Sequence, residues 1–266
     1  GLFMWARRML KLELNSDYAD VMELALYNGI SSGMSEDGKQ YFYVNPLEVN
    51  PAKVHQRYDL KHVRSSRVTW FGCACCPPNV ARILTSLEKY SYDISDDSNS
   101  IAIHLYLCGQ IIMSDDSVWN ITGKYLTDGK IEITYSGEER DFTLRLRNPG
   151  WSTACEIRIN GLRIKAESEQ GYFYILRKWK NGDTVQLKFG ITAQLVYANT
   201  YVEDDAGKVA VMRGPVVFCL EEADNGKNLS ELMIGTIESH CENSVILNGY
   251  REHTMDSIAL YSTNPP

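Results

Sequence analysis

The chain has 266 residues, of which 44% are hydrophobic and 23% charged, and its formal net charge is −7. This composition is that of an ordinary globular protein, and the length exceeds the usual size of one domain. The acidic excess argues against a nucleic-acid partner, because such binding depends on basic groups that neutralise phosphates. No stretch approaches the roughly 20 apolar residues that a membrane-spanning helix needs, so we expect no membrane partner.

The first third of the chain shows helical periodicity. Apolar residues recur at steps of three and four over 2–12, and again over 18–26 after the polar break at 15–17. The pair Asn28-Gly29 predicts a left-handed end for this second helix. A third helix is predicted to begin at Pro77-Pro78, because proline is tolerated in the first turn of a helix.

After residue 93 the pattern changes to short alternating segments that are separated by turn residues such as Asn, Asp, Gly and Pro. This pattern is typical of an antiparallel β-sandwich. The regular segments are 101–107, 131–135, 142–147, 156–159 and 185–189. We therefore predict an α+β multidomain protein, with a helical unit at 1–93, a β-sandwich domain at 94–199 and a second, incomplete β-sandwich domain at 200–266.

The chain contains seven cysteines, an odd number that is unlike a disulfide framework. Four of them are scattered singly: Cys108, Cys155, Cys219 and Cys241. We expect these four to be buried apolar residues in a reducing compartment, which predicts a cytoplasmic protein.

The other three cysteines, Cys73, Cys75 and Cys76, lie directly before the predicted third helix. The partial positive charge at a helix N-terminus favours thiolates, which both a soft metal and a nucleophilic reaction require. Cys75 and Cys76 can share one zinc ion, although no second Cys-x-x-Cys and no His pair at helical spacing completes the site. The residues alone leave metal binding, buried structural thiols and a redox Cys73–Cys75 pair open.

Residues 70–82 read Trp-Phe-Gly-Cys-Ala-Cys-Cys-Pro-Pro-Asn-Val-Ala-Arg, a segment that resembles the signature of glycoside hydrolase family 127, the β-L-arabinofuranosidases. Segments 1–5, 27–29, 41–48 and 213–215 are also similar to that family. The resemblance implies that the C-terminal helices of an (α/α)₆ barrel are followed here by β-sandwich domains. It also implies retaining glycoside hydrolysis with a zinc-bound cysteine thiolate as the nucleophile.

Position by position, the resemblance implies that Cys75 is the nucleophile and a zinc ligand, and that Cys76 is a second zinc ligand. Cys73 matches a neighbour that is not a ligand. Glu23 matches a glutamate of the site that binds substrate, and Tyr43 a tyrosine that contacts the sugar.

In the family, a glutamate and a cysteine two residues later complete the zinc site, and both lie upstream of the segment that matches Gly1. The general-acid glutamate lies further upstream. We therefore expect an internal fragment of a longer enzyme, inactive alone, whose parent releases L-arabinose from an oligosaccharide or glycoconjugate. A homodimer is left open.

The residues taken without the family suggest simpler roles. Glu23 lies on the polar face of its helix and would be solvated, and Tyr43 in an aromatic run would be a core residue. His104 is expected to be a satisfied or exposed histidine, and Trp151 to pack at the edge of the sandwich. The alternative function is a non-catalytic carbohydrate-binding β-sandwich with a structural zinc–thiol cluster, whose cysteines would be closed to alkylation.

Overall fold

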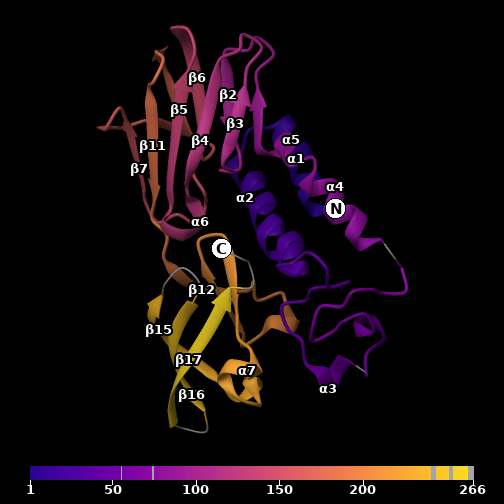
Figure 1. The fold of residues 1–266 in the computed structure, drawn as a ribbon. Helices are drawn as coiled ribbons and strands as arrows, with labels where there is room; N and C mark the ends of the chain where they lie inside the picture. Colours follow the sequence, from indigo (N-terminus) through magenta and orange to yellow (C-terminus); the bar gives the residue numbers. More distant parts are fainter. Residues whose placement is uncertain (55, 74, 241–243, 252–253, 263–266) are drawn as a thin grey trace.

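The structure is a computed structural model that describes residues 1–266 except 55, 74, 241–243, 252–253 and 263–266. A group of helices lies along one side of a two-layered β-structure, and a further sheet lies beyond one end of it (Figure 1). This mixed α+β arrangement of several sheets with few helices confirms the coarse fold class. The (α/α)₆ barrel stays a prediction from the resemblance.

The helical unit begins with an αα-hairpin of α1 (Leu2–Leu12) and α2 (Ser16–Leu24). Asn15 caps α2, because its Oδ1 accepts a hydrogen bond of 2.9 Å from the amide of Asp17. Short helices follow in α3 (Pro51–Val54), α4 (Cys76–Leu84) and α5 (Glu88–Ser91), with 3₁₀ turns at Ser31–Gly33 and Tyr58–Leu60. One buried cluster joins α1, α2 and α4: Phe3, Ala6, Leu10, Ala19, Met22, Leu26, Ile83 and Leu105.

The predicted helix end at Asn28-Gly29 is wrong. The chain continues from α2 into a π-helix, Ala25–Ile30. Asn28 is used for tertiary contact instead of a left-handed turn: its Nδ2 donates to the carbonyl of Pro215 at 2.8 Å, and its Oδ1 accepts from the amide of Val217 at 2.8 Å. This side-chain amide therefore pairs with distant backbone, a contact that local sequence does not reveal.

Two sheets form the β-sandwich that the alternating segments predict. One has the order β1-β2-β6-β10-β9 and the other β3-β4-β5-β11-β7-β8. Their bounds are Tyr92–Ile94 (β1), Ser100–Ile103 (β2), Gly109–Ile112 (β3), Val118–Lys124 (β4), Lys130–Ser136 (β5), Arg140–Arg147 (β6), Cys155–Ile159 (β7), Leu162–Ile164 (β8), Glu167–Glu169 (β9), Tyr172–Trp179 (β10) and Thr184–Phe189 (β11). A short helix, α6 (Tyr125–Asp128), joins β4 to β5.

One strand pair of the sandwich departs from the antiparallel prediction. β2 and β6 are parallel neighbours, with Ile101 opposite Leu144. Between them the chain crosses to the other sheet and forms β3, β4 and β5 there, so it returns in the same direction. Alternating side chains of both sheets fill the space between the layers, including Ile133, Leu144 and Trp179.

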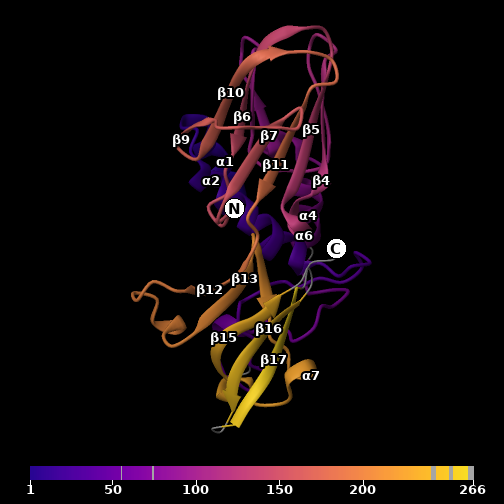
Figure 2. The ribbon, with the colours of Figure 1, turned by 90° about the vertical axis from the view of Figure 1, so that its left-hand side faces the viewer.

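The third sheet has the order β12-β13-β14-β17-β16-β15 and lies below the sandwich (Figure 2). Its bounds are Ala193–Tyr197 (β12), Val209–Arg213 (β13), Val216–Cys219 (β14), Met233–His240 (β15), Ser244–Arg251 (β16) and Thr254–Ser262 (β17), with α7 at Glu222–Asn225. It begins inside the range predicted for the first sandwich domain, because alternation alone does not tell which sheet a strand joins. The described strands of this part belong to one six-stranded sheet.

A buried polar network joins α1 to the sandwich. His104 is buried, with Nδ1 2.8 Å from the Tyr172 hydroxyl and Nε2 3.1 Å from Asp93 Oδ2. Arg7 pairs with the same aspartate. Burial, opposed by Asp93, lowers the pKa of His104. His104 is thus the satisfied histidine that the sequence predicts.

Of the helices that the described residues form, none has the length and apolar character of a membrane span.

Gly171 sets how closely α2 approaches the sandwich. It lies in the two-residue turn between β9 and β10 with φ +76°, and a Cβ there would be 1.8 Å from Ser16 Oγ and 2.5 Å from Ser16 Cβ. Gly171→Ala is therefore expected to cost about 1–2 kcal/mol of backbone strain and roughly 1–3 kcal/mol more for displacing α2. Urea unfolding monitored by circular dichroism measures the loss.

Gly161 provides the matched control. It occupies the equivalent position of the turn between β7 and β8 with φ +80°, and nothing lies within 4 Å of the position that a Cβ would take there. Gly161→Ala should show the backbone strain alone. Equal losses in the two variants would mean that the contact with Ser16 does not hold α2 in place.

Candidate functional site

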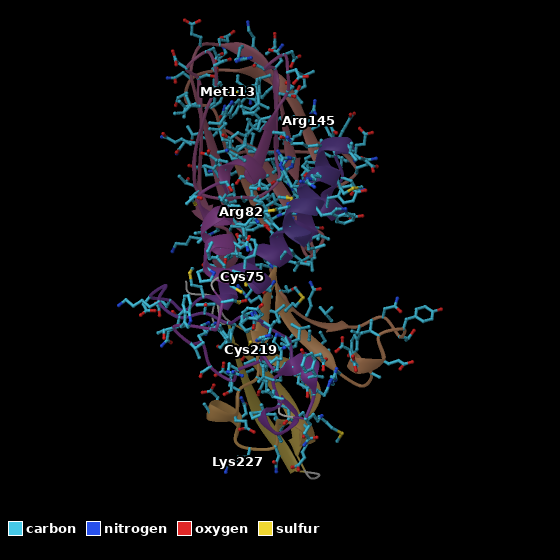
Figure 3. The ribbon with its side chains drawn as sticks, turned by 90° about the vertical axis from the view of Figure 1, so that its right-hand side faces the viewer. Cys75, Arg82, Met113, Arg145, Cys219 and Lys227 are labelled. Carbon is cyan, nitrogen blue, oxygen red and sulfur yellow. The ribbon has the colours of Figure 1, made fainter. Side chains whose placement is uncertain are left out.

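The cysteine loop meets the N-terminus of α4, as the two prolines predict. Cys75 is the N-cap residue and Cys76 the first residue of the helix. Figure 3 shows Cys75 at the end of this helix with Arg82 further along it. Asn79 Nδ2 donates to the Cys75 carbonyl at 2.7 Å, and Arg82 donates to Asn79 Oδ1 at 2.6 Å. Side chains of the helix therefore fix the backbone that carries Cys75.

The three thiols of this loop lie close together. Cys75 Sγ is 3.6 Å from the sulfur of Cys73 and 3.6 Å from that of Cys76. All three cysteines are free, Cys73 and Cys75 are exposed, and Cys76 is half-buried. The exposure of Cys73 and Cys75 disfavours the interpretation of these residues as buried structural thiols. It leaves these two sulfur atoms open to a reagent or a substrate.

The surroundings of Cys75 favour the ionised form of its thiol. Hydrogen bonds from Cys73, Tyr43 and Cys76 lower the pKa of its thiol below the ordinary value. Burial and the neighbouring Cys75 raise the pKa of Cys76 to about 11. Hydrogen bonds with Cys73 and Cys75 raise the pKa of the Tyr43 hydroxyl to about 12. Between the adjacent Cys75 and Cys76, the thiolate is therefore favoured at Cys75.

Tyr43 lies beside the cysteine loop. Its ring centroid is 4.5 Å from that of His62 and 5.4 Å from that of Phe71, and its carbonyl lies 3.8 Å from Cys76 Sγ. The side chain is half-buried, so the ring packs while the hydroxyl reaches the thiols. The structure thus brings Tyr43, Cys75 and Cys76 together in one site.

Sequence reasoning missed the residues that hold the loop of Tyr43. Asn45 Nδ2 donates to Ser32 Oγ at 2.9 Å, and Arg67 donates to the Ser32 carbonyl at 2.5 Å. The Arg67 guanidinium also lies 4.8 Å from the centroid of the Phe42 ring. The turn signal Asn45-Pro46 marks this loop in the sequence, but its partners come from distant positions.

Glu23 has a different position from the one that its helix periodicity predicts. It is 1% exposed, so the solvated role is wrong. Its carboxylate receives hydrogen bonds from Tyr125, Arg147 and Trp151, which all belong to the sandwich part of the chain. The indole nitrogen of Trp151 therefore bonds to the helical unit through Glu23. None of the hydrogen bonds of Glu23 among the described residues reaches the cysteine loop.

The thiol pair fits two positions of a zinc site. Two thiolates on one tetrahedral zinc at about 2.3 Å would have sulfur atoms roughly 3.8 Å apart. The observed distance between the Cys75 and Cys76 sulfurs is 3.6 Å. Within the described part of the chain, no group of three or more His, Cys, Asp or Glu side chains is arranged to hold a metal ion. Cys75 and Cys76 alone would thus hold a zinc ion only in part.

The scattered cysteines do not follow the prediction of burial. Cys108 is exposed, and Cys155 and Cys219 are half-buried. Burial raises the pKa of Cys155 to about 12, so this thiol stays protonated at neutral pH. Cys241 lies outside the described residues. Cys75, by contrast, is exposed and has a lowered thiol pKa.

Comparison with known sequences places the chain among the glycoside hydrolases. Three domain descriptions of one family match it in succession: the β-L-arabinofuranosidase GH127 catalytic domain over residues 1–89, the GH127 middle domain over 100–191, and the family 127 C-terminal domain over 193–255. The chain therefore belongs to glycoside hydrolase family 127, as the segment around the cysteines predicts.

Individual relatives support the same family. A non-reducing end β-L-arabinofuranosidase of Bifidobacterium longum subsp. longum is 39% identical over 236 residues, which are 86% of this chain and 35% of that protein. The crystal structure of a β-L-arabinofuranosidase from Geobacillus stearothermophilus T6 matches with 39% identity and a TM-score of 0.85, over 99% of this chain and 46% of that one. A family 127 β-arabinofuranosidase matches with 29% identity and a TM-score of 0.83, again over 99% and 46%. The chain spans less than half the length of these relatives.

Proposed function

We propose that this chain carries the nucleophile of a retaining β-L-arabinofuranosidase and that this nucleophile is Cys75. The observation that supports the proposal is the exposed Cys75 thiol at the N-cap of α4, whose pKa is lowered by its neighbours. Tyr43 and Cys76 lie against it. The substrate class, an L-arabinofuranoside, is proposed from the names of the family and its relatives.

The proposed reaction has two steps. The Cys75 sulfur attacks the anomeric carbon, the glycosidic bond breaks, and a glutamic acid from outside this sequence protonates the departing oxygen. The same glutamate then deprotonates a water, which attacks the anomeric carbon and releases L-arabinose and the thiolate, so the configuration is retained. Tyr43, whose hydroxyl bonds to Cys73 and Cys75, is proposed to contact the sugar.

Zinc is the cofactor of this proposal. When bound by Cys75 and Cys76 it would keep the thiols ionised at neutral pH and fix their orientation. The two remaining ligands are assigned by the resemblance to residues upstream of the match to Gly1. We therefore expect the 266 residues alone to bind zinc weakly and to show no hydrolase activity. The homodimer and the cytoplasmic location stay predictions.

The alternative, a carbohydrate-binding module with a closed structural zinc site, predicts cysteines that are protected from reagents. The exposure of Cys73 and Cys75 disfavours it. The rate at which the cysteines of this chain are alkylated distinguishes the two functions. If Cys75 is the nucleophile, iodoacetamide should alkylate it faster than the other cysteines, and zinc added in excess should slow that alkylation.

Peptide mass spectrometry after timed alkylation measures these rates. The exposed Cys108 is the control, because its rate should not change with zinc. Near-stoichiometric zinc in the purified chain together with an unreactive Cys75 would contradict the proposal and support the structural zinc site. Hydrolysis of a nitrophenyl β-L-arabinofuranoside by the 266 residues alone would contradict the expected inactivity.

A further inference from the structure

The most deeply buried charges in the described part of the chain lie between α2 and the sandwich. Arg147, at the end of β6, is 0% exposed, and Glu23 on α2 is 1% exposed. The two terminal nitrogens of Arg147 are divided between two carboxylates of α2, those of Asp20, at 2.5 Å, and Glu23. Asp20 and Glu23 are three positions apart and therefore share one face of the helix.

Both carboxylate oxygens of Glu23 are already occupied. Oε1 accepts from Arg147 and, at 2.7 Å, from the Tyr125 hydroxyl, while Oε2 accepts from Trp151 Nε1 at 2.8 Å. Asp20 is held similarly, because its Oδ2 accepts from the amide of Gly150 at 3.0 Å. All these donors come from β6, α6 and the loop after β6, so the sandwich supplies every one of these partners of the two α2 carboxylates.

These contacts argue against a role of Glu23 in binding the sugar. A carboxylate that contacts substrate must be accessible to it, whereas Glu23 is 1% exposed and both of its oxygens accept hydrogen bonds from the sandwich. Turning Glu23 toward a ligand would remove one of the two carboxylates that compensate a fully buried guanidinium, which is strongly unfavourable. The contacts of Glu23 thus connect α2 to the sandwich.

The same contacts bear on Cys75 through packing. Met22 of α2 and Ile83 of α4 belong to one buried cluster, and Cys75 is the N-cap residue of α4. A shift of α2 on the sandwich would therefore change the position of α4 and of the cysteine loop. The sandwich acts here as the base on which the cysteine-bearing unit is oriented.

We propose that Glu23 is a positioning residue that clamps α2 to Arg147, Tyr125 and Trp151 of the sandwich, and that it does not contact the sugar. This inference deepens the proposed function and rests on it only for the role of the cysteine loop. The clamp itself involves neither zinc nor hydrolysis. Measurements of the clamp can therefore fail or succeed independently of the proposed activity.

A double-mutant cycle on the 266-residue chain tests the clamp. Glu23→Gln and Arg147→Met should each lower the Tm by roughly 10 °C. The first leaves the buried Arg147 with one carboxylate in place of two, and the second leaves Asp20 and Glu23 without their cation. The double variant should lose clearly less than the sum of the two. The exposed pair Glu156–Arg158 provides the control, since Glu156→Gln should shift the Tm by no more than about 2 °C.

A second readout concerns the hydrogen bond itself. The indole N–H of Trp151, assigned in ¹H–¹⁵N spectra with Trp151→Phe, should exchange slowly with water in the unmodified chain and move upfield in Glu23→Gln. A Tm of Glu23→Gln equal to that of the control, with additive effects of Glu23 and Arg147, would overturn the proposal. If the variants fail to fold, a rapidly exchanging Trp151 indole in the unmodified chain would overturn it equally.

Discussion

Cys75→Ser is expected to abolish hydrolysis of nitrophenyl β-L-arabinofuranoside by the enzyme to which this chain contributes. The loss of kcat should be on the order of 10⁴-fold or more, as for removal of a nucleophile in other covalent mechanisms. The serine keeps the size of the side chain but remains protonated where the Cys75 thiol, with its lowered pKa, ionises. Steady-state kinetics with the nitrophenyl substrate measures the effect.

Cys73→Ser is the matched control for this prediction. Cys73 lies 3.6 Å from the same sulfur, is also exposed, and is not assigned a zinc ligand or a covalent role. Its hydrogen bond contributes to the lowered pKa of Cys75, so we expect a change of about tenfold or less. Near-normal activity of Cys75→Ser, or equal losses in the two variants, would refute Cys75 as the nucleophile.

The arrangement of the cysteine loop was largely predictable because its residues are close in sequence. The two prolines directly after the three cysteines mark the start of a helix, so the sequence itself places the cysteines at a helix N-terminus. The segment is also specific enough to identify the family. Tyr43 could be placed beside the thiols only through the resemblance, because about thirty positions separate it from Cys75 and no periodicity links them.

The role of Glu23 could not be predicted in the same way. On a helical wheel it falls on the polar side of α2, which indicates water for an isolated helix. That face is covered instead by Arg147, Tyr125 and Trp151, more than a hundred positions away. Polar residues at an interface between domains have the same sequence pattern as residues at the surface, and only the structure separates the two cases.

In the fold, too, the strands were predictable from local sequence, whereas their directions and partners were not. Alternation predicted β5 (Lys130–Ser136) and β11 (Thr184–Phe189) as strands, and they pair as antiparallel neighbours. It did not predict that β2 runs parallel to β6, because strand direction depends on how many strands the chain forms in the other sheet before it returns. Similarly, β12 resembles the strands before it but pairs with β13 in the third sheet.

The largest effect on stability is expected from Trp179→Ala. Trp179 is 0% exposed, its ring lies 5.1 Å from that of Trp119 in an edge arrangement, and its Nε1 donates to the Phe142 carbonyl at 2.9 Å. Removing the side chain opens a cavity between the two sheets and breaks that hydrogen bond. The free energy of unfolding should fall by about 3–5 kcal/mol. Urea denaturation followed by circular dichroism measures the change.

The neighbouring Trp119 separates packing from hydrogen bonding in this core. It is 1% exposed, but its Nε1 has no hydrogen-bond partner among the described residues. Trp119→Phe and Trp179→Phe remove similar volume, yet only the second breaks a bond, and the first removes a buried donor that is unsatisfied. Trp179→Phe should therefore be more destabilising than Trp119→Phe by about 1–3 kcal/mol. If the order is reversed, the hydrogen bond to Phe142 does not contribute to the stability of the sandwich, and the two indoles differ only in how tightly they are packed.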